Sequence, residues 1–198
     1  MTSESQPSSR DRLVGATVRL LRKQGYAASG VSEIARTGHA PMGSFYHYFP
    51  DGKEQLAAAA IDAGAAEYAA LIERALTGGG TLPEQLSRVA KLTARALQRS
   101  GFELGCPVAT TALETITTSD TLQDRAAGAF AQWQGIICQR CIDEGVSASQ
   151  ASELAMNVIA LIEGAELLAR VRRSVDPLDA AENAIRLMAT TVLPNATQ

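Results

Sequence analysis

Two short helical patterns around a tight turn constrain this chain more than any other part of its sequence. Apolar residues within 31–37 recur at i, i+3 and i+4, which is the spacing of one helical face. Gly38 and His39 interrupt this pattern. Pro41 then suits the first turn of a second helix, where a missing N–H costs nothing, and Pro50 ends that helix. The sequence therefore predicts two short helices in succession.

The second of these helices has two different faces. Phe45, Tyr48 and Phe49 are spaced i, i+3 and i+4 and are predicted to face inward. The residues left on the outer face are Met42, Ser44, Tyr46 and His47. Two short helices around a tight turn, the second with such a free face, are typical of a helix-turn-helix. In that motif the second helix lies in the major groove of DNA.

The same stretch carries a family resemblance. The string GSFYHYFPDGKEQL, residues 43–56, resembles the DNA-binding signature of TetR/AcrR-type transcriptional regulators. Ala40-Pro41 before it, and one extra residue within 50–53, resemble the LmrA/YxaF-like branch of that family. The resemblance is strong over the first 60 residues or so. It implies an all-helical homodimer, in which a DNA-binding head responds to a ligand bound in a larger body.

The resemblance also implies individual DNA contacts. Tyr46 and His47 match a tyrosine and a histidine that contact phosphates or base methyl groups. Lys53 matches a lysine that holds a phosphate, beside the free N–H groups of a helix N-terminus. The full predicted set is Ser32, Met42, Gly43, Ser44, Tyr46, His47 and Lys53. The alternative is an ordinary aromatic core patch, which suits Phe45 and Phe49 better than it suits the outer face.

Three positions depart from the general family pattern. Met42 replaces a lysine, so a cationic contact is lost and an apolar one, such as to a thymine methyl group, is gained. His39 replaces the glycine of the turn, which costs conformational energy if the turn needs a positive φ. Gly30 stands where a hydroxyl residue is common. These departures affect the operator sequence and not the class of activity.

The rest of the chain predicts helices only. Alanine is abundant, aromatic residues make up 5%, and β-branched runs are few. Predicted helix starts lie at Ser8, Ser29, Pro41, Asp51, Thr81, Cys106, Asp120, Ser147 and Asp176. We therefore expect an all-α fold of nine helices: a disordered tail over residues 1–8, a helix-turn-helix head over 9–56 and a ligand-binding and dimerisation body over 57–198.

The last two predicted helices are apolar on almost every side. One begins near Ser147 and the other near Asp176. A helix of that kind must be covered on more than one side. A second copy of the chain would cover the side that the body leaves open, which predicts a homodimer through these two helices. The alternative is that both are central in the core of a monomer.

The body is expected to hold a small hydrophobic or aromatic effector. This expectation comes from the resemblance, because the stretch GCPVATTALE from Gly105 looks like the LmrA/YxaF-like body. The candidate ligand-binding residues are Phe102, Cys106, Thr110, Phe130, Trp133 and Gln134. An apolar pocket with few polar groups would suit them. For any one aromatic residue, a place in the core is the competing interpretation.

From its charge and hydropathy we expect the protein to be cytoplasmic. The net charge is −3, yet residues 1–56 are mildly basic and the remainder is acidic, as suits a protein that touches phosphates at one end. The sequence contains no run of about 18 apolar residues, so we predict no membrane span. The polar N-terminus lacks the apolar region of a signal peptide.

Cysteine chemistry and catalysis are the rival hypotheses. Cys138 and Cys141 form a C-x-x-C pair in the middle of a predicted helix, whereas a redox pair has its first cysteine at a helix N-terminus. A redox-responsive regulator remains an alternative, as does a helical binding protein with a vestigial head. Neither a zinc ligand set, a cofactor motif nor a nucleophile with its base is evident, and Glu163 and Glu166 alone do not suggest an enzyme.

Overall fold

Side-chain caps explain where several helices begin. Ser8 Oγ accepts the N–H of Asp11 at 3.1 Å, and the Asp11 carboxylate accepts the hydroxyl of Ser8 at 2.7 Å. At Thr81 the Glu84 carboxylate accepts the backbone N–H at 2.8 Å. Ser147 Oγ accepts a backbone N–H of the following turn. Each cap satisfies a polar group that the first turn of a helix otherwise leaves without a partner.

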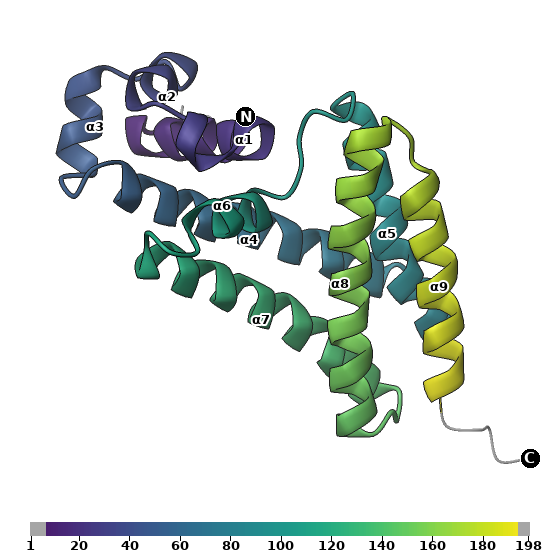
Figure 1. Ribbon diagram of the computed structural model, residues 1–198. Helices are drawn as coiled ribbons and strands as arrows, with labels where there is room; N and C mark the ends of the chain where they lie inside the picture. The colour runs from purple at the N-terminus through teal and green to yellow at the C-terminus, as the bar shows by residue number, and fades with distance from the viewer. Residues whose placement is uncertain (1–6, 194–198) are drawn as a thin grey trace, which may run out of the picture. The chain divides into compact units, whose positions relative to one another are not determined.

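The computed structural model describes residues 7–193, and these residues form nine α-helices without a strand (Figure 1). They are α1 (Ser9–Ala28), α2 (Val31–Thr37), α3 (Met42–Tyr48), α4 (Lys53–Thr77), α5 (Leu82–Arg99), α6 (Pro107–Thr115), α7 (Asp120–Asp143), α8 (Ala148–Arg172) and α9 (Asp176–Val192). The all-α prediction is confirmed. Most of the predicted tail, and Pro194 beyond the last helix, lie outside the described residues.

The start of α2 differs from the prediction. Gly30 is the N-cap residue and Ser29 is buried one position earlier. The hydroxyl of Ser29 donates to the carbonyl of Gly25 at 2.6 Å, so it serves the end of α1. Gly25 itself has φ of 82°, a left-handed conformation that glycine adopts without strain, and it kinks α1 before its last residues.

By packing, the chain divides into two compact units. Among the described residues, the first unit holds those up to Ala65 together with Cys106–Ala129, and the second holds Ala66–Gly105 and those from Phe130 to residue 193. The first unit therefore contains α1, α2, α3 and α6, and the second contains α5, α8 and α9. The helices α4 and α7 each contribute their N-terminal part to the first unit and their C-terminal part to the second.

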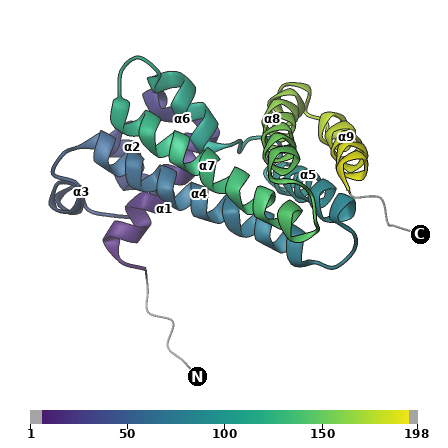
Figure 2. The same cartoon turned by 90° about the horizontal axis from the view of Figure 1, so that it is seen from below.

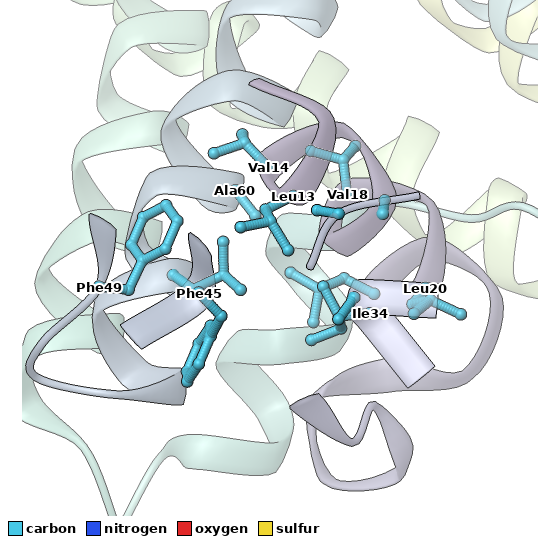
Figure 3. Close-up of a cluster of buried hydrophobic side chains, with 13 residues drawn as sticks. Leu13, Val14, Val18, Leu20, Ile34, Phe45, Phe49 and Ala60 are labelled. Carbon is cyan, nitrogen blue, oxygen red and sulfur yellow. The ribbon is translucent and has the colours of Figure 1, made fainter. Parts of the chain in front are cut away.

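The core of the first unit joins all three head helices to α4. Figure 3 shows Leu13 of α1, Ile34 of α2, Phe45 of α3 and Ala60 of α4 in one buried hydrophobic cluster. The first three of these are at most 2% exposed. Burial of such side chains stabilises the fold by about 1.5–3 kcal/mol each. This core anchors α3 through Phe45, the one buried residue of that helix.

The second unit packs α5 against both α8 and α9, and α8 against α9 (Figure 2). Its core includes Trp133, which is fully buried. Some large apolar side chains of α8 and α9 nevertheless stay exposed, namely Met156, Leu167, Leu168, Val171 and Leu187. Within the described residues, no helix is long and apolar enough to cross a membrane.

Candidate nucleic-acid interface

The outer face of α3 carries most of the predicted DNA contacts. Tyr46 is 66% exposed, Met42 is 37% exposed, and Gly43 and His47 are exposed as well. Phe45 lies on the opposite side of the helix, 2% exposed, and its ring meets the ring of Tyr46 edge-on with centroids 5.0 Å apart. A buried aromatic anchor therefore supports an exposed aromatic side chain on the next residue.

Gly43 leaves open space in the middle of this face. A Cβ built on Gly43 would meet no other atom within 4 Å, so the packing of the protein does not require glycine there. The missing side chain instead lowers the surface beside Met42 and lets the α3 backbone come close to a neighbouring molecule. Ser44 beside it is half-buried, and Ser32, on the first turn of α2, is exposed.

Tyr48 is a surface residue that the sequence pattern placed wrongly. We predicted that it faces inward with Phe45 and Phe49, but it is 38% exposed. Its ring instead meets the ring of His47 edge-on, with centroids 4.8 Å apart. Tyr48 is the last residue of α3, and Phe49, directly beyond the helix, takes the buried position beside Phe45. The end of the helix at Pro50 was the signal that could have revealed this.

The turn between α2 and α3 is tight and strained. His39 has φ of 48°, as its replacement of a glycine predicted. Gly38 before it has no room for a side chain, because a Cβ there would approach the carbonyl oxygen of Arg12 within 2.8 Å. Arg12 also donates from Nε to the carbonyl of Gly38 at 3.2 Å. The turn is therefore held against α1, which fixes the angle between α2 and α3.

Lys53 is engaged inside the first unit. Its ammonium donates to the carbonyl of Tyr26 at 2.6 Å and lies 4.2 Å from the centroid of the Tyr26 ring. Partial burial lowers the pKa of Lys53, and the nearby Glu114 carboxylate partly offsets that effect. An ammonium has three N–H donors, so this contact leaves donors for a phosphate.

The sequence comparisons agree with this geometry. Residues 13–60 match the bacterial regulatory proteins of the tetR family, and residues 83–184 match the C-terminal domain of LmrA/YxaF-like transcriptional regulators. The chain belongs to the TetR family of transcriptional regulators. An uncharacterized HTH-type transcriptional regulator of Mycobacterium tuberculosis is 35% identical, over 93% of this chain and 96% of that protein.

Two further relatives cover most of the chain. The HTH-type transcriptional regulator LmrA of Bacillus subtilis is 30% identical, over 88% of this chain and 93% of its own length. The crystal structure of regulatory protein TetR from Rhodobacter sphaeroides superposes with a TM-score of 0.82 at 27% identity, over 91% of this chain and 98% of that chain. TetR-family regulators bind operator DNA and form dimers.

The six predicted effector residues fall into both units of this regulator. Cys106 and Thr110 belong to the first, at the start of α6, where Cys106 Sγ accepts the N–H of Ala109 at 3.4 Å. Phe102, Phe130, Trp133 and Gln134 belong to the second.

Aromatic contacts join two of these six residues. The rings of Phe130 and Trp133 meet edge-on with centroids 5.2 Å apart, and Tyr68 meets Trp133 in the same way at 4.7 Å. The hydroxyl of Tyr68 lies 3.3 Å from that of Thr93. Sequence reasoning missed Tyr68, because an alanine-rich helix gave no pattern that singled it out. A surface hollow of about 550 Å³ between α4 and α7 includes none of the six among its lining residues.

The cysteine pair of this regulator lies near the C-terminal end of α7, and not in the middle of the helix as predicted, but it is equally far from the helix N-terminus that a redox pair requires. Cys141 is fully buried, and that burial raises its pKa to about 11. Cys138 is half-buried and both are thiols. A thiol with so high a pKa is a poor nucleophile at neutral pH.

Proposed function

We propose that this TetR-family regulator represses transcription by binding a palindromic operator, and that a small hydrophobic or aromatic effector releases it. The observation that carries the proposal is the face of α3, where Met42, Gly43, Tyr46 and His47 are exposed above a buried aromatic anchor. An exposed short helix with polar and aromatic groups suits readout of the major groove. Repression is what the family resemblance implies.

The proposed contacts keep the predicted set and extend it. They are Ser32, Met42, Gly43, Ser44, Tyr46, His47 and Lys53, with Tyr48 added because its hydroxyl-bearing ring is exposed beside His47. Tyrosine hydroxyl and lysine ammonium groups donate to phosphates, whereas Met42 offers an apolar contact. The phosphate contacts set position on the duplex, and the α3 residues nearest the bases set sequence preference.

We propose dimerisation through α8 and α9 because large apolar side chains on these helices are exposed in the single chain. Leu167 is 62% exposed, Val171 is 76% exposed and Leu187 is 68% exposed, although large apolar side chains are usually covered. In a symmetric dimer the same face of each copy covers the other, so one exposed face is enough. Two heads held in this way would match two half-sites about one helical turn of DNA apart.

Release by an effector would follow from thermodynamic linkage. An effector that prefers the arrangement with low operator affinity weakens operator binding by the same coupling free energy, typically about 1–3 kcal/mol. The residues proposed to meet it are Phe102, Cys106, Thr110, Phe130, Trp133 and Gln134. We propose no catalytic role for the chain and expect it to act in the cytoplasm, where bacterial DNA is located.

Neither rival function has an observation in its favour. The buried thiol of Cys141 argues against an oxidant sensor that uses the C-x-x-C pair. The exposed Tyr46 beside a packed core favours a functional head over a vestigial one.

Selection of binding sites from random duplex DNA tests the proposal. We expect the full-length protein to enrich a palindrome whose half-sites are separated by about one helical turn. Insertion of about five base pairs between the half-sites should abolish tight binding, because the two heads would then face opposite sides of the duplex. Recovery of no common sequence by a folded dimer would contradict the proposal and favour a vestigial head.

A further inference from the structure

One peptide group of the first unit lies between two opposite charges. The carbonyl oxygen of Tyr26 accepts the Lys53 ammonium at 2.6 Å, while the N–H of the next residue, Ala27, donates to Glu114 Oε2 at 2.7 Å. The carbonyl and the N–H belong to the same peptide bond. A peptide dipole has its negative end at oxygen and its positive end at N–H, so both contacts are favourable.

The Glu114 carboxylate also occupies the space that a side chain at position 25 would need. A Cβ built on Gly25 would overlap Glu114 Oε1, and φ at Gly25 is 82°. The positive φ favours glycine at this position, and any larger residue there would also displace the Glu114 carboxylate from the turn. Glu114 is an exposed residue, yet its carboxylate is held at the turn by the hydrogen bond from the Ala27 N–H.

This peptide is directly connected to the start of α2. The N–H of Ser29 donates to the carbonyl of Tyr26 at 3.1 Å, and the Ser29 hydroxyl donates to Gly25 at 2.6 Å. Gly30 then caps α2, whose first turn includes Ser32. The position of the Tyr26–Ala27 peptide therefore determines where α2 begins, and α2 packs against α3.

Glu114 itself lies outside the three head helices, on α6. That helix packs against α1, and its Pro107 lies against Gly64 of α4. At the other end of the α6–α7 connection, the Ser119 hydroxyl donates to Glu54 Oε1 at 2.6 Å. The Glu114 carboxylate therefore reaches the α1–α2 turn from α6, a helix that is itself packed against α1 and α4.

From this arrangement we infer that Glu114 is a positioning residue for operator binding: with Lys53, it holds the α1–α2 turn so that α2 and α3 keep the geometry that DNA requires. The inference rests on the proposed function. It predicts a change in DNA affinity opposite to the one expected from charge alone. Removal of an acidic group from a DNA-binding unit ordinarily strengthens DNA binding or leaves it unchanged, because repulsion of phosphates is lost. Removal of Glu114 should weaken it.

The test compares Glu114→Ala and Glu114→Gln with the wild type on the selected operator, by fluorescence anisotropy at several salt concentrations. Asp124→Asn is the matched control, since Asp124 is an exposed acid on α7 in the same unit. Amide hydrogen exchange of residues 26–32 is measured on the same full-length variants without DNA, and thermal unfolding checks that each is folded.

We expect Glu114→Ala to bind about fivefold more weakly, as the loss of one charge-assisted hydrogen bond at an exposed site implies. Glu114→Gln should lie between it and the wild type, because its oxygen still accepts the Ala27 N–H. The slope of log affinity against log salt should stay unchanged, because Glu114 itself neutralises no phosphate. Exchange should accelerate at Ala27 and not in α4. Asp124→Asn should bind as the wild type does or more tightly.

Three outcomes would overturn the inference. Operator affinity of Glu114→Ala equal to or above that of the wild type would do so, even with a lowered melting temperature, since that pattern describes a purely structural contact. Exchange accelerated equally throughout the first unit would do so as well. If the wild type binds no DNA sequence, the proposed function fails separately. In that case hydrogen exchange alone tests whether Glu114 holds the α1–α2 turn. Unchanged exchange at Ala27 in Glu114→Ala would show that it does not.

Discussion

Gly64 of α4 and Pro107 of α6 lie so close that no side chain fits between them. A Cβ on Gly64 would come within 2.7 Å of Pro107 Cγ, and a proline ring cannot rotate away as a flexible side chain can. Both residues belong to the first unit. This contact seats the start of α6 against α4 and so supports the helix that carries Glu114.

Gly64→Ala should therefore lower the free energy of unfolding by about 1–3 kcal/mol, as overpacking of a close contact does. Gly128→Ala is the matched control, because a Cβ on this helical glycine of α7 would meet nothing within 4 Å. That change should stabilise by about 0.5–1 kcal/mol through helix propensity. Denaturant unfolding measures both, and equal effects of the two substitutions would contradict the close packing.

His39 offers a test of strain in the helix-turn-helix. Its φ of 48° is unfavourable for any residue with a Cβ, so His39→Gly should remove strain while His39→Ala should keep it. Because the added freedom of glycine in the unfolded chain offsets part of the gain, we expect the glycine variant to be about 1 kcal/mol more stable than the alanine variant. Urea denaturation compares them, and a more stable alanine variant would show that the turn is not strained.

Leu167→Asp tests the dimer face. Leu167 of α8 is 62% exposed, so the substitution should leave the fold of one protomer intact, but in a dimer it would bury a charge in an apolar interface. Sedimentation velocity should show a monomer for this variant and a dimer for the wild type. Leu113→Asp on α6, at 75% exposure, is the control and should stay dimeric. A dimeric Leu167→Asp would place the interface elsewhere.

Cys141 should resist chemical modification. With its pKa raised to about 11 by burial, only about one molecule in a thousand carries the thiolate at pH 8. Iodoacetamide should label Cys138 before Cys141 in the native protein, whereas both should react alike in denaturant. Mass spectrometry of tryptic peptides identifies the label. Preferential labelling of Cys141 in the native protein would revive the redox-responsive alternative.

The same pKa implies a dependence of stability on pH. An ordinary thiol, as in the unfolded chain, ionises near pH 9, while the folded one keeps its proton to about pH 11. The contribution of Cys141 to stability is therefore present below pH 9 and lost as the pH rises from 9 to 11. Cys141→Ala should show a smaller decline in stability over that range than the wild type.

The helices could be predicted from the sequence because the capping residues and apolar spacing that define a helix lie within the helix itself. Thr81 with Glu84, and Ser147 at its helix start, cap the helices that the sequence assigned to them. The outward face of α3 was predicted from helical spacing, and Tyr46 is exposed accordingly. The same spacing failed at Tyr48, the last residue of α3, which is exposed while Phe49 after it is buried.

Other features depend on contacts between distant parts of the chain and have no sequence signal. The hydrogen bond from the Ala27 N–H to Glu114 joins residues 87 positions apart, and neither segment has a sequence pattern that predicts it. Ser29 was predicted to cap α2 from its residue type, but its hydroxyl bonds backward to Gly25. Gly25 lies within α1, and that it makes room there for a carboxylate from α6 follows only from the packing.

The most direct test of the account compares the wild type with Tyr46→Ala on the DNA upstream of the gene that encodes the chain. Fluorescence anisotropy is measured at two salt concentrations, with scrambled DNA as the control. We predict tight, sequence-selective binding by the wild type that weakens at higher salt, and at least tenfold weaker binding by Tyr46→Ala with unchanged stability, because Tyr46 is 66% exposed. Equal affinity of the two proteins would contradict the assignment of α3 as the DNA-reading helix.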